Sequence, residues 1–251
     1  MSPRPAPLAA ATGATKRFGE LLAVDRVDLT VAAGEVVGLI GANGAGKTTL
    51  IRMLLGLLAP SGGRVRLFGE PPSRRTRARL GYVPQSLGLY EDLTVAENLA
   101  FSAAAYGSAG ATLEGELAEA RDVLVRDLPL GLRRRAAFAI ALAHHPDLLV
   151  LDEPTSGVDP LARARLWETI RASAEQGAGV LVTTHHLAEA EHCDRLVVLA
   201  AGLPVSLVGR SLRVPGADPD ALRRLLAEAA VPADLAQVPA SFEETFVVLA
   251  A

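Results

Sequence analysis

A glycine-rich stretch near residue 41 has the residue types and spacing needed to hold a chain of phosphates. It runs Gly41-Ala-Asn-Gly-Ala-Gly-Lys-Thr-Thr49 and fits the pattern G-x-x-x-x-G-K-[ST]. Glycine lets backbone N–H groups turn inward around phosphate oxygens, and a helix that starts there adds the positive end of its dipole. The residues expected to contact a nucleoside triphosphate are Gly41, Asn43, Gly44, Ala45, Gly46, Lys47, Thr48 and Thr49.

Charge and reach give each side chain at the end of this loop its own expected role. The Lys47 ammonium bridges the β- and γ-phosphates, the Thr48 hydroxyl binds Mg²⁺, and Thr49 helps to hold the α-phosphate. The alternative is a glycine-rich turn that fits the pattern by chance. A strand pattern before the loop and a helix pattern after it argue against that alternative.

Two acids follow an apolar run further along the chain, in Leu148-Leu-Val-Leu-Asp152-Glu153-Pro154. Charges at the carboxyl end of a strand lie in the crevice where α/β sheets bind ligands. We expect Asp152 to hold the same Mg²⁺ as Thr48, and Glu153 to accept a proton from an attacking water as a general base. The alternative, in which both acids only cap the next turn, is weakened by the phosphate loop elsewhere in the chain.

The elements that must position these residues alternate between apolar strand patterns and helical patterns, which favours a mostly parallel sheet covered by helices. The expected strands are Val36 to Ile40, Gly81 to Val83, Leu148 to Leu151, Val180 to Thr183 and Arg195 to Leu199. Two further segments, Val27 to Val31 and Arg64 to Leu67, are typical of a small antiparallel sheet. The helix after the phosphate loop is indicated by the spacing of Leu50, Met53, Leu54, Leu57 and Leu58.

The segment from about residue 88 to 146 is Ala-rich and lacks strand patterns, so it is expected to form a helical subdomain. Residues 203–251 are expected to form a small C-terminal extension to a domain that spans residues 1–202. In this extension Asp218 and Pro219 predict the start of a helix through Leu226. Ser241 and Glu244 form a capping-box pattern, which predicts a last short helix carrying Phe242, Phe246 and Leu249.

Composition narrows the classes of protein further. The chain has 251 residues, of which 50% are hydrophobic and 21% charged, as is usual for a globular protein, and its net charge of −3 gives no general attraction to nucleic acid. No apolar run approaches the ~20 residues that cross a bilayer, and the N-terminus lacks the pattern of a secretory signal. The single Cys193 cannot form an internal disulfide, which favours a cytosolic location.

From Leu8 to Gly202 the chain resembles the nucleotide-binding subunits of ABC transporters, because several separately spaced motifs occur in the order typical of that family. Phe18 lies where the family stacks an aromatic ring on adenine. Gln85, in Gly-Tyr-Val-Pro-Gln, matches the glutamine that senses Mg²⁺ and the γ-phosphate. Ser156-Gly-Val-Asp159 resembles the loop that crosses the dimer interface, and His185 matches the switch histidine at the γ-phosphate.

One motif departs from the family. The signature Leu-Ser-Gly-Gly-Gln, which reaches the ATP of the other subunit, is Leu128-Pro-Leu-Gly-Leu132 here, so only Gly131 fits. Pro129 offers phosphate neither a hydroxyl nor an N–H, and Leu130 is bulky where close backbone approach is needed. The sequence Leu-Pro-Leu-Gly resembles a variant of this motif found in drug-exporter subunits of the family. Either a homodimer uses two altered signatures, or a heterodimer combines this chain's catalytic residues with another subunit's signature.

The resemblance implies an ABC-type P-loop NTPase fold and a dimer that binds ATP and Mg²⁺ at its interface. It also implies a separate transmembrane permease as partner, a location on the cytoplasmic side of the membrane, and export rather than import. A segment between Tyr106 and the signature is shorter than is usual for the family, which leaves the docking of the permease open. The alternatives are a mainly regulatory subunit and a soluble ABC-type ATPase, although the chain has no coiled-coil insertion or basic surface pattern for nucleic acid.

Two other groups of residues receive less specific interpretations. His185, His186, His192 and Cys193 lie close together in sequence, but their spacing lacks the paired ligands of a zinc site. The Arg-rich segments at residues 74–79 and 133–135 are expected to be solvated surfaces.

Overall fold

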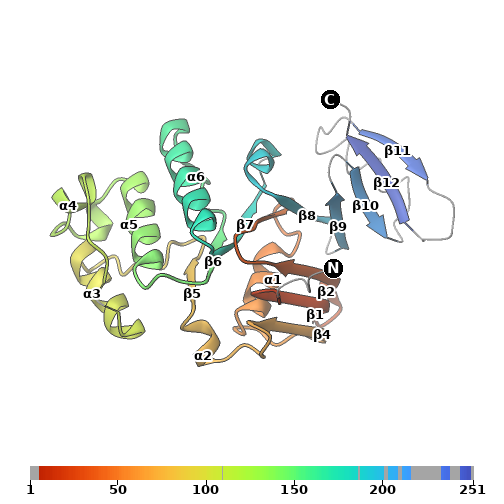
Figure 1. Ribbon diagram of the computed structural model, residues 1–251, viewed down its shortest axis with the longest axis horizontal. Coiled ribbons are helices and arrows are strands. Elements are labelled where there is room, and N and C mark those ends of the chain that lie inside the picture. Colours follow the sequence, from red (N-terminus) through yellow and green to blue (C-terminus); the bar gives the residue numbers. More distant parts are fainter. Residues whose placement is uncertain are drawn as a thin grey trace.

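The computed structural model describes residues 6–108, 110–185, 187–200, 203–208, 211–215, 233–237 and 244–249. Strands and helices alternate through most of this part of the chain, as the apolar patterns predict (Figure 1). The helices are α1 (Lys47–Leu54), α2 (Arg74–Arg77), α3 (Val95–Tyr106), α4 (Glu116–Glu119), η1 (Val125–Asp127), α5 (Leu130–Leu142), α6 (Pro160–Glu175) and η2 (Leu187–His192), where η marks a 3₁₀ helix. Within the described residues, no helix is long and apolar enough to cross a membrane.

The larger sheet confirms the expected parallel architecture. Its spatial order is β11 (Ala233–Gln237), β12 (Glu244–Leu249), β10 (Ser211–Pro215), β9 (Leu203–Val208), β8, β3, β7, β6 and β5, and the neighbours from β8 to β5 are parallel. The parallel strands are β3 (Val36–Ile40), β5 (Leu80–Val83), β6 (Leu148–Asp152), β7 (Gly179–Thr184) and β8 (Arg195–Ala200). Because the phosphate loop follows β3 and the two acids end β6, the carboxyl edge of this sheet brings both motifs to one side.

The smaller sheet is antiparallel, as expected, and has the order β2-β1-β4. Its strands are β1 (Ala9–Phe18), β2 (Leu21–Val31) and β4 (Gly62–Leu67). The two predicted segments lie inside β2 and β4, whereas β1, which pairs with both of these strands, has no separate prediction.

Two layers of core lie on opposite faces of the parallel sheet. Every residue of β3, β6 and β7 is buried, which explains why these strands are continuous apolar runs. Along β6, Leu148 and Val150 pack in the cluster that includes α1 and the small sheet, whereas Leu149 and Leu151 pack with α5 and α6. The period of two along the strand therefore divides its side chains between the two layers.

The predicted helical region is present. Residues 88–146 contain α3, α4, η1 and α5, which gather at one end of the molecule (Figure 1). α3 begins with a capping box in which the Thr94 side chain accepts the Glu97 N–H and the Glu97 side chain accepts the Thr94 N–H. It ends at Gly107, whose φ of 64° is left-handed.

Helix α1 is shorter than the leucine spacing suggests. It ends at Leu54, and Gly56 adopts a φ of 68°. The Gly56 N–H donates to Met53 O at 2.9 Å and the Leu57 N–H donates to Arg52 O at 2.9 Å, the pattern of a glycine-terminated helix. Leu57 therefore leaves the helix and is exposed.

The end of the chain differs from its prediction. The remaining strands of the larger sheet are β9 (Leu203–Val208), β10 (Ser211–Pro215), β11 (Ala233–Gln237) and β12 (Glu244–Leu249). The helix predicted from Ser241 and Glu244 is wrong, because Glu244–Leu249 pairs with β10 and β11 as β12. β9 pairs with β8, so the sheet continues across the expected boundary near residue 202. The helix predicted from Asp218 to Leu226 lies outside the described residues.

Candidate functional site

The phosphate loop turns between β3 and α1 in a form that only glycine fits well. Gly46 directly precedes α1 and has a φ of 95°. A Cβ at this position would lie 2.4 Å from Ala23 O, closer than real contacts allow. Gly44 has a φ of 83° but open space around it, so its requirement for glycine comes from backbone conformation alone.

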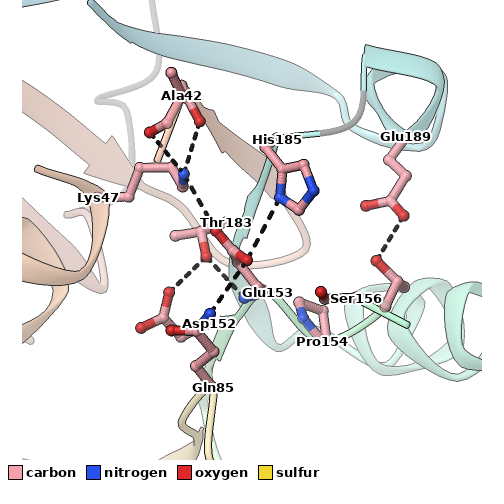
Figure 2. A network of polar contacts seen from close by, with 12 residues as sticks. Ala42, Lys47, Gln85, Asp152, Glu153, Pro154, Ser156, Thr183, His185 and Glu189 are labelled. Carbon is pink, nitrogen blue, oxygen red and sulfur yellow. Dashed lines mark hydrogen bonds and ion pairs between the residues drawn. The ribbon is translucent and has the colours of Figure 1, made fainter. Parts of the chain in front are cut away.

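Lys47 points back into its own loop. Its Nζ donates to Gly41 O at 2.7 Å and to Ala42 O at 3.2 Å, and lies 3.2 Å from Glu153 Oε1 (Figure 2). The residue is 4% exposed. A buried ammonium needs anionic or oxygen partners, and the loop and Glu153 supply them here.

The Glu153 carboxylate is the meeting point of three segments that are far apart in sequence. Besides Lys47, Glu153 Oε2 accepts from Gln85 Nε2 at 3.4 Å and lies 3.4 Å from His185 Nδ1 (Figure 2). Gln85 follows β5, and His185 follows β7. The fold therefore brings together the three residues that the sequence singled out as catalytic candidates.

The Glu153 backbone is strained, because its φ of 51° lies in the left-handed region. This conformation costs an ordinary residue about 1–2 kcal/mol. The Glu153 N–H donates to Thr183 Oγ1 at 2.8 Å, and Thr183 Oγ1 donates to Asp152 Oδ1 at 2.7 Å. One threonine hydroxyl on β7 therefore contacts both acids.

A cavity of about 450 Å³ adjoins the phosphate loop. Ten of the expected site residues line it: Phe18, Asn43, Gly44, Ala45, Gly46, Lys47, Thr48, Thr49, Gln85 and Glu153. Phe18 is 49% exposed at this cavity, and Lys16 Nζ lies 5.2 Å from the centre of its ring. An exposed ring beside the cavity is available for stacking, whereas a core aromatic would be buried.

A neighbouring cavity of about 320 Å³ is lined by Thr48, Gln85 and Asp152, among others. A hydroxyl, an amide and a carboxylate offer the oxygen ligands that Mg²⁺ prefers. The residues expected to hold the metal thus fit it, although they lie on three different elements.

Asp159 and Gly131 lie apart from these cavities. Asp159 caps α6, because its Oδ1 accepts from Leu161 N at 3.1 Å and Ala162 N at 3.0 Å. Gly131 is the second residue of α5, whose N-cap, Pro129, makes no side-chain capping bond. A Cβ on Gly157 would lie 3.7 Å from Leu130 Cδ2, so the start of α5 and the loop before Asp159 are adjacent.

The sequence analysis assigned no role at the site to three buried residues whose side chains bond to it. Arg134 was expected on a solvated surface, and that prediction is wrong, because Arg134 is 6% exposed. Its Nη1 donates to Glu153 O at 3.3 Å and Pro154 O at 2.6 Å, and its Nη2 donates to Ser156 O. Burial lowers the pKa of the Arg134 guanidinium from its usual value. The only sequence signal was its place in the second turn of the helix after the signature.

The other two missed residues are polar and buried. Thr183 ends an apolar run, and a hydroxyl in such a position is a weak signal by itself. Glu189 is 2% exposed, and its Oε1 accepts from Thr155 Oγ1 at 2.5 Å. Cys193 packs closely on β3, because a Cβ on Gly38 would lie 2.8 Å from Cys193 Sγ. The ring of the preceding residue, His192, stacks on Trp167.

The fold and the site together define a P-loop nucleotide-binding domain. Residues 24–156 match the family model described as "ABC transporter". The chain is 42% identical over 236 residues to "Nod factor export ATP-binding protein I" of Paraburkholderia xenovorans, covering 84% of this chain and 78% of that protein. It belongs to the ABC transporter family, as an ATP-binding subunit.

Two further similarities agree with this membership. The chain is 40% identical over 223 residues to "Probable multidrug ABC transporter ATP-binding protein YbhF" of Escherichia coli, covering 82% of this chain and 39% of that protein. The chain thus spans well under half of that longer relative. A solved structure titled "Structure of ATP binding subunit of ABC transporter" superposes with a TM-score of 0.72 at 28% identity, covering 89% of this chain and 98% of that chain.

Proposed function

We propose that this chain hydrolyses ATP to drive an ABC exporter whose membrane-spanning part is a separate permease. The observation that carries the proposal is the meeting of Lys47, Gln85 and His185 on the Glu153 carboxylate beside the phosphate loop. A structural ion-pair network would not need the glycines at 44 and 46 or an open cavity next to it. The names of the relatives support export over import.

The proposed roles of the side chains agree with their positions in the site. Lys47 and the N–H groups at the start of α1 hold the phosphates, and Phe18 stacks on the adenine. Glu153 accepts a proton from the water that attacks the γ-phosphorus, while His185 and Gln85 orient the γ-phosphate and that water. Thr48 and Asp152 would hold Mg²⁺, which neutralises phosphate charge when bound.

A dimer completes each site. The start of α5, with Gly131, and the loop that ends at Asp159 are adjacent on one side of the chain and are proposed to face the ATP of a second subunit. Pro129 and Leu130 weaken this contact, because Pro129 offers phosphate neither a hydroxyl nor an N–H and the Leu130 side chain is bulky where close backbone approach is needed. A homodimer therefore hydrolyses slowly, or a heterodimer places a complete signature over this chain's catalytic residues.

The permease is proposed to dock on a hollow of about 360 Å³ between the segment after Gln85 and helices α3 and α5. Exposed aromatic rings border this hollow at Tyr90, Phe101 and Tyr106. Since Gln85 lies just before the hollow and contacts Glu153, a shift of the docked partner would reach the catalytic centre. This arrangement favours a transport subunit over a soluble ATPase.

The function is tested with Glu153→Gln in the purified chain, alone and mixed in equal amounts with candidate partner subunits. The glutamine keeps the shape of the side chain but cannot take up a proton, so hydrolysis should fall by at least about 100-fold. Binding of Mg-ATP should persist and a closed dimer should accumulate. Rapid turnover by this variant would remove Glu153 from the role of base, and full activity of the wild-type chain alone would rule out an obligate heterodimer.

Absence of Mg-ATP binding by the wild-type chain would overturn the function itself. A regulatory subunit would instead bind Mg-ATP and remain without hydrolysis in every mixture. Glu119→Gln serves as the control, because Glu119 is an exposed acid at the end of α4. This variant should leave Mg-ATP binding and ATP hydrolysis unchanged.

A further inference from the structure

The candidate general base has a backbone conformation that is unfavourable for a residue other than glycine. Glu153 has a φ of 51°, and in this turn after β6 its carboxylate contacts Lys47, Gln85 and His185. A strained residue persists where its surroundings hold it, so the groups that bond its backbone decide where the carboxylate lies.

Both backbone polar groups of Glu153 are bonded to side chains of other elements. Thr183, on β7, accepts the Glu153 N–H at 2.8 Å. Arg134, on α5, donates from Nη1 to the Glu153 carbonyl at 3.3 Å. The peptide groups on either side of the base are thus fixed from two directions.

Arg134 holds the residues that follow as well. The same guanidinium donates to Pro154 O at 2.6 Å and to Ser156 O, so one side chain bonds three carbonyls of a single turn. Between them, Thr155 Oγ1 donates to the buried Glu189 at 2.5 Å. Only arginine carries enough donors in a planar array to satisfy this set, because a lysine ammonium is a single point of charge.

We propose that Arg134 is a positioning residue for ATP hydrolysis, which holds the Glu153–Ser156 turn so that the Glu153 carboxylate stays directed at the attacking water. The inference rests on the proposed function, since it concerns the base of that reaction. Arg134 also belongs to α5, whose first three residues are part of the altered signature, and its hydrogen bonds connect the turn that carries the base to that helix. The placement of Glu153 therefore depends on where α5 lies.

The test compares Arg134→Met and Arg134→Lys with Arg135→Met in the full chain, in whichever assembly hydrolyses ATP. Arg135 is the matched control, because it is the next residue of α5 and bonds Glu116 at the surface. Arg134→Met should lower kcat by at least 10-fold while the KM for ATP and the Kd for Mg-ATP stay within about twofold. Arg134→Lys should recover part of the loss, and Arg135→Met should retain the wild-type kcat.

Melting temperatures separate positioning from folding. If Arg134→Met does not fold, Arg134→Lys with a near-native melting temperature carries the test, and it should still lose severalfold in kcat. In the Glu153→Gln background, Arg134→Met should change the residual rate by less than twofold, because the base on which it acts is already absent.

A wild-type kcat in either Arg134 variant would overturn the inference. So would parallel loss of Mg-ATP affinity and kcat, which is the result expected of a merely structural residue. Failure of the proposed function appears differently, as a wild-type chain that neither binds nor hydrolyses ATP.

Discussion

The Lys47 ammonium lies 3.2 Å from Glu153 Oε1, and both side chains are less than a tenth exposed. The residue expected to hold the γ-phosphate is therefore in contact with the residue expected to activate water. Opposite charges this close and this shielded from solvent interact strongly, so a change in one side chain alters the other.

Thr183→Val should impair catalysis although Thr183 touches no substrate in the proposed mechanism. Valine keeps the shape of threonine but leaves the Glu153 N–H and Asp152 Oδ1 without their shared hydroxyl. Each buried unsatisfied group costs about 1–3 kcal/mol, so both stability and kcat should fall. Thr183→Ser, which keeps the hydroxyl, is the control, measured by urea unfolding and steady-state hydrolysis. Equal behaviour of the two variants would contradict this assignment.

Gly46→Ala should abolish Mg-ATP binding, because the new Cβ would lie 2.4 Å from Ala23 O and force the loop open. Gly44→Ala is the matched comparison, since Gly44 shares a positive φ but has open space around it. That variant carries only backbone strain of about 1–2 kcal/mol and should keep measurable affinity. Calorimetric titration distinguishes them, and comparable affinities would show that steric fit at position 46 is unimportant.

Phe18→Ala should weaken ATP binding by roughly 5- to 10-fold, the loss expected when a base loses its aromatic stacking partner. Phe18→Trp should restore the affinity. Because Phe18 is 49% exposed, the melting temperature should change little in either variant. An unchanged affinity in Phe18→Ala would place adenine elsewhere.

Pro129→Ser should stabilise the chain, because serine at the N-cap of α5 can accept an N–H that Pro129 leaves without a side-chain acceptor. Such caps contribute about 0.5–2 kcal/mol. If the altered signature slows hydrolysis in a homodimer, Pro129→Ser with Leu130→Gly should also raise kcat. Urea unfolding measures the change in stability, and steady-state hydrolysis measures the change in kcat. A lower kcat in the double variant would mean that activity requires the Leu-Pro-Leu-Gly sequence.

The motifs that the sequence predicted are those whose chemistry is local. A phosphate loop needs glycines, a lysine and a threonine within nine residues, and the strand before it is a continuous apolar run because both its faces are buried. The resemblance to the ABC family predicted that Phe18, Gln85, Glu153 and His185 share one site. For the last three the fold gives a physical reason, since they follow strands of the parallel sheet, whose carboxyl ends lie at one edge. Phe18 instead ends β1 of the antiparallel sheet.

Local sequence patterns gave wrong predictions where pairing with residues distant in sequence determines the secondary structure. The capping-box pattern at Ser241 and Glu244 favours a helix, but pairing of residues 244–249 with β10 and β11 on either side gives a strand. The apolar spacing predicted that the helix after the phosphate loop includes Leu57. The helix ends before this residue, because Gly56 adopts a left-handed conformation.

The sequence by itself determined the phosphate loop and the acid pair, because each of these motifs is defined by residue types a few positions apart. Only the tertiary structure decided which side chains contact these motifs and position their residues. Arg134 lies in an arginine run that looks like surface, and its burial on the carbonyls of Glu153 and Pro154 arises from the packing of α5 against the end of β6. No pattern along the chain encodes such a contact, since a side chain's environment is set by the elements that the fold brings beside it.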